Sequence, residues 1–345
     1  MPEKLAIGID IGGTKIAAGV VDENGRVLAR QVTETPSTDP AAVLEAIGQI
    51  VDAFRQEHHV RAVGIGAAGF VDETGSTVLF APHLAWRNEP LRDAVARRTG
   101  LPVLVENDAN ASGWAEWHFG AAQNESDVVL VTLGTGIGGA IVIDGRPYRG
   151  RFGVAGEFGH MQVVPDGLPC ECGNRGCWEQ YASGRVLTRL GRAAAEGGSP
   201  LGRRLLEDAG GVVDDIHGLH VTVAAQAGDE EAVQWLAEVG EWLGVGVANL
   251  AAALDPGVVV VGGGVSDAGE LLLGPARSAF ARTLTGRGYR PEARIVVAHL
   301  GPEAGLIGAA DLARITARRR RPASPDVRVR SRGAGRSGRS TRRRR

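Results

Sequence analysis

A chain of 345 residues with 43% hydrophobic content has the length of about two domains and enough apolar side chains for real cores. It lacks a secretory signal pattern and any uncharged apolar run of the roughly 18 residues that a membrane span needs, so we expect a cytoplasmic protein. The net charge of −2 conceals an asymmetry: residues 318–345 hold 13 Arg and one acid, which leaves 25 basic against 39 acidic residues before them, a formal charge of about −14.

The chain opens with a pattern that occurs twice. Residues 5–30 and 127–150 each predict a strand, a glycine-rich turn, a second strand and a further extended piece. Around the first copy, a helical pattern at 40–58 alternates with buried-looking strands at 61–69 and 101–108. This alternation is typical of an α/β domain.

A mostly helical stretch from about 183 to 254 follows the second copy, and then an apolar strand with a third glycine cluster at 257–266. The closing helix at 304–316 is apolar on one face, so it can return to the first domain. With a hinge near Trp117, we expect a small α/β domain of 1–117 plus 303–317 and a large α/β domain of 118–302.

The last segment, 318–345, has almost nothing apolar to bury, so we expect a disordered Arg-rich tail. Adhesion to nucleic acid or another polyanion is one interpretation of it. A solvated extension is the other, and we favour it because Arg-rich tails are common in chains of biased composition.

The two glycine turns do not fit the best-known nucleotide motifs. In "GIDIGGTK" a threonine separates Gly13 from Lys15 and a strand follows, whereas the Walker loop must open a helix. "LGTGIGG" contains G-x-G-x-x-G, but it also continues as a strand, so the dinucleotide-binding interpretation fails.

Each turn alone is as consistent with an ordinary hairpin as with phosphate binding. Two such turns plus the third cluster favour a site where backbone N–H groups hold the phosphates of ATP. Asp10, in the first turn, can hold Mg²⁺ there directly or through water. The candidate ATP and phosphate residues are Asp10, Gly12, Gly13, Thr14, Lys15, Thr135, Gly136, Gly138, Gly262, Gly263 and Gly264.

The strand at 101–108 ends in Glu106, Asn107 and Asp108. Polar groups at the carboxyl end of a strand point into the usual ligand crevice of an α/β domain. An Asp or Asn before a helix is equally often only its N-cap, so the pattern leaves both interpretations open.

All three cysteines of the chain lie within eight positions, and His160 precedes them. Cys170, Cys172, Cys177 and His160 make a Cys₃His set, which is a favoured tetrahedral zinc combination. The loop lacks the H-x-E and P-C-x-x-C pattern of zinc deaminases. With four ligands no position remains for water, so we expect a structural Zn²⁺ within 160–179; buried inert cysteines are the alternative.

The segments "DIGGTK", "GAAGFVD", "VENDANA", "LGTGIGG", "GEFGH", "CECGNRGCWE" and "VVVVGGGVS" follow one another in this order. Together they resemble the ROK sugar kinases, over about Leu5 to Thr316, and within them most of all the bacterial glucokinases. The resemblance implies a two-domain actin-like ATPase (ribonuclease H-like) fold with its active site in the cleft between the domains. It also implies transfer of the ATP γ-phosphate to O6 of glucose with Mg²⁺, and a homodimer or homotetramer.

The resemblance also assigns roles to single residues. It implies that Asp108 is the catalytic base and that the acceptor sugar is contacted by Gly69, Asn107, Asp108, Glu157, His160 and Glu179. Two positions depart from the family pattern, since Ala68 stands where proline is frequent and His83 where asparagine is common. These departures bear on the rigidity of the sugar loop and on sugar selectivity.

Other functions remain open at this stage. Mannose or an N-acetylated hexosamine can be the acceptor, and polyphosphate can be the donor. A sugar-responsive transcriptional regulator is a hypothesis of another class, because some family members bind DNA. We disfavour it and expect no specific nucleic-acid partner, since only nine residues precede Asp10 and the tail has no element able to read a groove.

Overall fold

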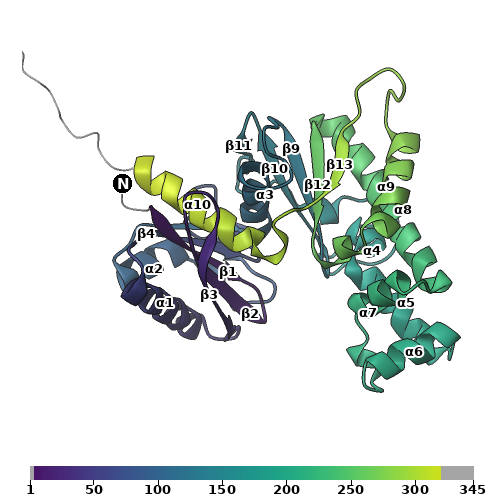
Figure 1. The fold of residues 1–345 in the computed structure, drawn as a ribbon, viewed down its shortest axis with the longest axis horizontal. Coiled ribbons are helices and arrows are strands. Elements are labelled where there is room, and N and C mark those ends of the chain that lie inside the picture. Colours follow the sequence, from purple (N-terminus) through teal and green to yellow (C-terminus); the bar gives the residue numbers. More distant parts are fainter. Residues whose placement is uncertain (1–3, 320–345) are drawn as a thin grey trace, which may run out of the picture.

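The computed structural model describes residues 4–319, which form two lobes, each built on a five-stranded sheet (Figure 1). The sheet of the first lobe has the order β3-β2-β1-β4-β8, with β1 antiparallel to β2 and parallel to β4. Its strands are β1 (Leu5–Ile11), β2 (Lys15–Val21), β3 (Val27–Glu34), β4 (Val60–Ala67) and β8 (Val103–Asn107).

The sheet of the second lobe repeats this topology in the order β11-β10-β9-β12-β13. Here β9 is antiparallel to β10 and parallel to β12. The strands are β9 (Val128–Leu133), β10 (Ile137–Ile143), β11 (Arg146–Pro147), β12 (Val258–Gly262) and β13 (Arg294–Val297). The α/β class and the repeated opening pattern are therefore confirmed.

Helices cover both faces of the first sheet. α1 (Pro40–Glu57) and α2 (Leu91–Thr99) pack on the face that carries Ile7 and Ile9. α10 (Ala304–Arg319) packs on the other face, as the period-2 alternation of β1 requires. α3 (Asp108–His118) packs beside α10 and also lies against the second sheet, where a Cβ at Gly113 would lie 2.5 Å from the Cβ of Ala140 (Figure 1). Glycine allows α10 to approach closely, because a Cβ at Gly8 or Gly64 would lie 1.8 Å from a carbonyl oxygen of α10.

The second lobe buries most of its apolar surface under its helices. Val129 and Val131 face this larger core, whereas Val128 and Leu130 face a smaller one near Trp117. The helices are α4 (Glu179–Ala182), α5 (Gly184–Glu196), α6 (Pro200–Asp208), α7 (Gly218–Gln226), α8 (Glu230–Leu254) and α9 (Glu270–Thr283), with short 3₁₀ turns η1 (Phe158–His160), η2 (Val213–Asp215), η3 (Gly264–Ala268) and η4 (Gly301–Glu303).

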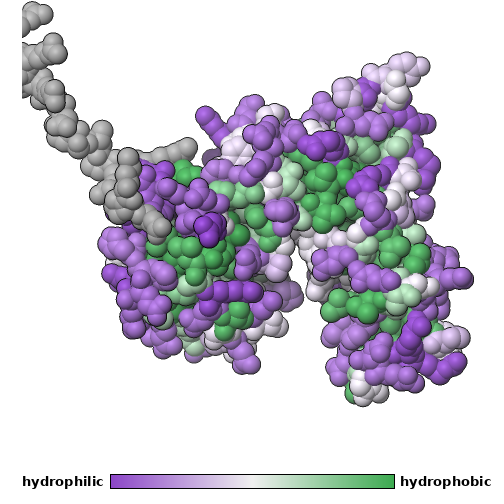
Figure 2. Space-filling model, viewed as in Figure 1, coloured by the Kyte–Doolittle hydropathy of each residue, from purple (hydrophilic) through white to green (hydrophobic). Residues whose placement is uncertain are grey.

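A small antiparallel sheet of β5 (Phe70–Val71), β6 (Val78–Phe80) and β7 (Arg87–Glu89) extends the first lobe. The chain passes to the second lobe through α3 and returns through 298–303 into α10, and the surface is hollowed between the lobes (Figure 2). α10 reaches Arg319, two residues into the segment expected as a tail; the rest of that segment lies outside the described residues. Within 4–319, no helix has the length and apolarity needed to cross a membrane.

Candidate active site

The end of β8 places Asn107 and Asp108 at the start of α3. Asn107 is the N-cap: its Oδ1 accepts from the Asn110 N–H at 3.0 Å. Its Nδ2 donates to the carbonyl of Gly69 at 3.1 Å and so holds the "GAAG" loop. The N-cap predicted for an Asp or Asn at this point is therefore Asn107 and not Asp108.

The Gly69 loop is held on its other side as well. A Cβ at Gly69 would lie 2.4 Å from the carbonyl oxygen of Phe80, so glycine is needed there. The N–H of Ala68 donates to the Ile11 carbonyl at 3.2 Å, a bond that proline could not make. Ala68 therefore holds this loop through a backbone hydrogen bond, where a proline would restrict it through its ring.

Asp108 and Asp10 approach each other across Gly66. A Cβ at Gly66 would lie 3.6 Å from the Asp108 Cα and 3.7 Å from the Asp10 Oδ1. Burial raises the pKa of Asp10 to about 7; the Asp108 charge adds to this and Lys15 opposes it. Burial also raises the pKa of Asp108, although N–H groups at the start of α3 and the Asn107 amide oppose the rise.

The first glycine turn joins β1 to β2. The Gly12 N–H donates to the Lys15 carbonyl at 3.0 Å, and Thr35 Oγ1 donates to the Gly12 carbonyl at 2.8 Å. Thr14 and Lys15 are exposed, and Gly13 packs against the backbone and Cβ of His83. These hydrogen bonds hold the turn in place and leave Thr14 and Lys15 exposed on it.

The second turn joins β9 to β10 and lies close to the candidate sugar residues. A Cβ at Gly136 would lie 2.5 Å from Glu179 Oε2, and one at Gly138 would lie 2.6 Å from Thr132 Oγ1. Thr135 is exposed at the tip of the turn. Only glycine therefore allows the backbone at these two positions to lie so close to the Glu179 and Thr132 side chains.

The third glycine cluster lines a cavity of about 340 Å³ together with Asp10. Gly262 ends β12, and Gly263 and Gly264 lead into η3. Of the predicted phosphate residues, the cavity brings together Asp10, Gly262, Gly263 and Gly264. The remaining predicted residues of the other two turns do not line it.

Sequence reasoning missed several polar residues of this cavity. Ser112 and Glu116 follow Asp108 at intervals of four on α3, and this helical spacing was a usable signal. Ser266 and Asp267 come from η3, just after the glycine cluster. Nothing local in the sequence indicates that Thr132, which belongs to β9, also lines the cavity.

The predicted sugar residues of the second lobe gather near Asp108. Burial raises the pKa of Glu157; His160 lowers it, and the charges of Asp108 and Glu179 raise it further. Glu179 is buried at the start of α4, with its Oε1 3.9 Å from His160 Nδ1 and 3.2 Å from Cys170 Sγ. Glu157 and Glu179 therefore offer acceptors, and His160 adds a ring nitrogen.

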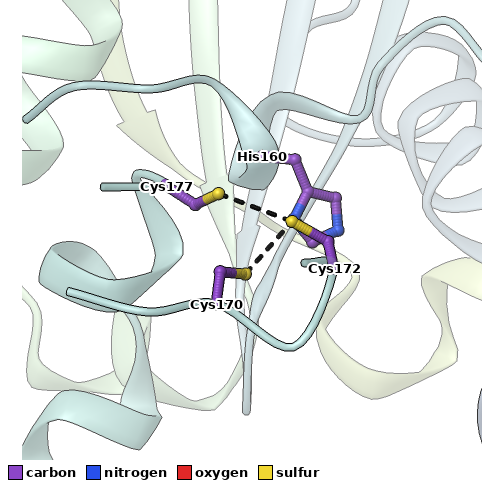
Figure 3. Close-up of side chains that lie close together, drawn as sticks. All are labelled: His160, Cys170, Cys172 and Cys177. Carbon is purple, nitrogen blue, oxygen red and sulfur yellow. Dashed lines mark hydrogen bonds between the residues drawn. The ribbon is translucent and has the colours of Figure 1, made fainter. Parts of the chain in front are cut away.

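The donor atoms of His160, Cys170, Cys172 and Cys177 all lie within 4.8 Å of one another (Figure 3). The loop folds as a tight hairpin with bridges between Gln162 and Cys177 and between Pro169 and Arg175. Gly173 and Gly176 adopt positive φ angles of 92° and 74°, which non-glycine residues rarely do. The sequence prediction that these four residues meet is thus confirmed.

The spacing of these donors fits a tetrahedral zinc site. Zn–S and Zn–N bonds of about 2.3 and 2.0 Å place tetrahedral donor atoms roughly 3.5–3.8 Å apart. Cys172 Sγ and Cys177 Sγ are 3.6 Å apart, and Cys170 Sγ and His160 Nδ1 are 3.8 Å apart. All three cysteines are free, and burial raises the pKa of the Cys177 thiol to about 12, so a thiolate there needs a cation beside it.

Comparison with known proteins gives a consistent result. Residues 6–316 match the ROK family. A glucokinase of Streptomyces coelicolor is 51% identical over 310 residues, which cover 90% of this chain and 98% of that protein. A crystal structure of a ROK family glucokinase from Streptomyces griseus in complex with glucose and AMPPNP has a TM-score of 0.83 and 54% identity, and covers 90% of this chain and 99% of its own.

A ROK family transcriptional regulator, a homolog of the E. coli MLC protein, also has a similar structure. Its TM-score is 0.79 at 28% identity, over 91% of this chain and 78% of its own. The similarity to these two glucokinases is therefore higher in sequence and extends over nearly the whole of their length.

Proposed function

This chain belongs to the ROK family, and on that premise we propose that it is a glucokinase that transfers the γ-phosphate of ATP to O6 of glucose. Its two lobes with matching five-stranded sheets are the actin-like ATPase fold that the sequence resemblance implied. The observation that carries the proposal is the Asp108 carboxylate, which lies at the lobe junction close enough to Asp10 to raise its pKa, while the N-cap of α3 is supplied by Asn107.

In the proposed mechanism, Asp108 accepts the proton of the attacking hydroxyl. A carboxylate is a weak base at its ordinary pKa, and burial raises the pKa of Asp108 towards the range where proton transfer is efficient. Asn107 fixes its position, because one side chain caps α3 and holds the Gly69 carbonyl. Positioning of this kind provides much of the rate enhancement in phosphoryl transfer.

The acceptor sugar is assigned to Gly69, Asn107, Glu157, His160 and Glu179. Carboxylates suit adjacent hydroxyls because each hydroxyl can donate a hydrogen bond. The lobe arrangement supports this assignment, since the charge of Asp108 in one lobe raises the pKa of Glu157 in the other. Closure of the lobes would then exclude water from the reacting phosphate.

The nucleotide is assigned to the glycine turns, with Gly12, Gly13, Thr14, Lys15, Thr135, Gly136 and Gly138 on either side of the cleft and Gly262, Gly263 and Gly264 in the cavity. Asp10 lines that cavity, and a divalent cation is the partner that a buried carboxylate with a raised pKa lacks. Mg²⁺ held by Asp10 and the phosphates would neutralise charge on the transferring group.

A structural Zn²⁺ would be held by His160, Cys170, Cys172 and Cys177. It would fix the loop between Glu157 and Glu179 without taking part in the reaction. The proposal includes a cytoplasmic location, where thiols stay reduced, and a homodimer or homotetramer. A regulator is the weaker candidate, because regulator relatives are 28% and 33% identical and kinase relatives reach 51% and 54%.

The test is formation of glucose 6-phosphate from glucose and Mg·ATP in a coupled assay. We expect turnover by the wild type and a loss of roughly 10²–10⁴-fold in kcat for Asp108→Ala, with glucose binding retained. Asp208→Ala, at an exposed aspartate on α6, is the matched control. Absence of turnover by the folded wild type would contradict the proposal; the same assay with mannose, N-acetylated hexosamines and polyphosphate would then identify the acceptor and donor.

A further inference from the structure

Glu106 is a buried carboxylate that the proposed mechanism does not use. It precedes Asn107 at the end of β8 and is only 2% exposed. Its Oε1 accepts from the Asn107 N–H at 3.1 Å and from Asn110 Nδ2 at 3.2 Å. Glu106 therefore holds the peptide next to Asp108 and the first turn of α3.

The other oxygen of Glu106 is paired with an arginine of the second lobe. Arg149 Nε donates to Glu106 Oε2 at 2.5 Å, and its Nη2 contacts the same oxygen. Arg149 follows β11, and its side chain is 27% exposed. A charge-assisted bond to a buried carboxylate thus joins the two lobes beside Asp108.

Arg149 also begins the loop that carries Glu157. Its carbonyl accepts from the Ala155 N–H at 3.1 Å, which closes residues 149–155 into a compact turn. Within this turn, a Cβ at Gly153 would lie 2.2 Å from the Val71 carbonyl of the first lobe. Gly156, at φ 105°, then leads directly into Glu157.

We propose that Arg149 is a positioning residue for the acceptor sugar. By binding Glu106 when the lobes come together, Arg149 aligns Asp108 with Glu157. A buried ion pair adds little net stability, because the desolvation of both charges offsets their attraction. The pair instead fixes the position of the segment that carries the base, Asp108, relative to the loop that carries Glu157, a hydrogen-bond acceptor for the sugar. The inference rests on the proposed kinase function.

Arg149→Met removes the charge and keeps most of the side-chain volume. We expect the KM for glucose to rise and kcat to fall, each by about tenfold or more, while the KM for ATP changes less than about twofold. Arg149→Lys should recover part of the loss, because it restores a cation but not the fork geometry. Arg151→Met, two residues along the same loop and exposed, should behave as wild type.

Glu106→Gln keeps the acceptor for Asn107 and removes the negative charge. In the Arg149→Met background it should add little to the loss from either single change, since the two residues act as one unit. Glucose KM and kcat within twofold of wild type in Arg149→Met would overturn the inference. Additive losses in the double variant would also overturn it, because they indicate that the two residues act independently. So would an equal rise in the KM for ATP, which indicates a general loss of structure.

The wild type separates this inference from the proposed function. If wild type phosphorylates glucose, the variant kinetics decide the role of Arg149. If it does not, hydrogen exchange on the full chain decides it, because Arg149→Met should speed exchange at 107–111 and 149–157 together. Unchanged exchange at both segments, or faster exchange at only one of them, would overturn the coupling independently of any substrate.

Discussion

Asp10 and Asp108 lie on either side of Gly66, and each negative charge makes ionisation of the other less favourable. Burial is the larger cause for both residues. The pair thus concentrates negative charge at the lobe junction, where a divalent cation and the acceptor hydroxyl are proposed to bind. The cost of this arrangement should be visible as a dependence of stability on pH.

Asp10→Asn should remove that dependence. The pKa of Asp10 is about 7 in the folded protein and 3.8 is its ordinary value, so the folded state binds the extra proton between these pH values. The free energy of unfolding therefore falls as pH rises from about 4 to 7, and the loss persists above pH 7. We expect Asp10→Asn to be more stable than wild type by about 1–3 kcal/mol at pH 8 and nearly equal to it at pH 4.

Urea unfolding at pH 4 and pH 8 measures this difference, with the exposed Asp208→Asn as the control. Mg²⁺-dependent turnover should be lost in Asp10→Asn, so stability and activity change in opposite directions. A variant that is less stable than wild type at pH 8 would show that the Asp10 carboxylate is compensated by partners within the chain.

Residues 160–179, where we propose that zinc binds, act as one element because the two ends of this loop carry the proposed sugar residues. His160 belongs both to the donor cluster and to the sugar set, and Glu179 Oε1 lies 3.2 Å from Cys170 Sγ. Gly176 leaves no room for adjustment, since a Cβ there would lie 1.7 Å from the Val164 carbonyl. Loss of the ion should therefore disturb sugar binding and stability together.

We expect Cys172→Ala to lose bound zinc, to raise the KM for glucose by about tenfold, and to melt at a lower temperature. Zinc content by atomic spectroscopy, glucose kinetics and thermal unfolding measure the three effects. Arg175→Ala, exposed in the same loop, should keep all three properties. Normal zinc content together with a normal KM in Cys172→Ala would refute the link between the ion and the sugar site.

The features of the fold and of the site that the sequence predicted are those with a local sequence pattern. The two strand-turn-strand repeats and the Cys₃His cluster were predicted because their signals lie within about 25 residues of sequence. The small sheet of β5, β6 and β7 was not predicted, since strands of two or three residues show no periodicity. The Glu106–Arg149 pair spans 43 residues and two lobes, so no local signal indicates it.

At the scale of the whole molecule, two crossing segments hold the lobes in relation to each other. α3 and α10 pack so closely that a Cβ at Gly308 would lie 1.8 Å from the Ala111 carbonyl. Buried Asp311 of α10 accepts from Trp114 Nε1 at 2.8 Å and contacts His118 Nδ1 at 2.7 Å, both on α3. The two helices thus form a rigid joint between the sheets.

The return crossing is fastened to this joint by Glu116. Its side chain is buried, and its oxygens accept from the backbone N–H groups of His299 at 3.0 Å and Leu300 at 2.7 Å, and from that of Ala121 at 2.9 Å. Glu116 also lines the cavity that contains Asp10. The position of the crossing and the shape of the cavity proposed for the nucleotide are therefore both tied to the Glu116 carboxylate.

Even the isosteric change Glu116→Gln should weaken the joint, because both carboxylate oxygens accept N–H groups and an amide must present its own NH₂ to one of them. An unsatisfied buried donor costs about 1–3 kcal/mol, so we expect the melting temperature to fall by several degrees and the KM for ATP to rise. Differential scanning fluorimetry and ATP kinetics measure this, with the exposed Glu207→Gln of α6 as the control. Because glucose is assigned to other residues, its KM should change less than that for ATP; unchanged melting with an unchanged KM for ATP would show that the crossing holds its place without Glu116.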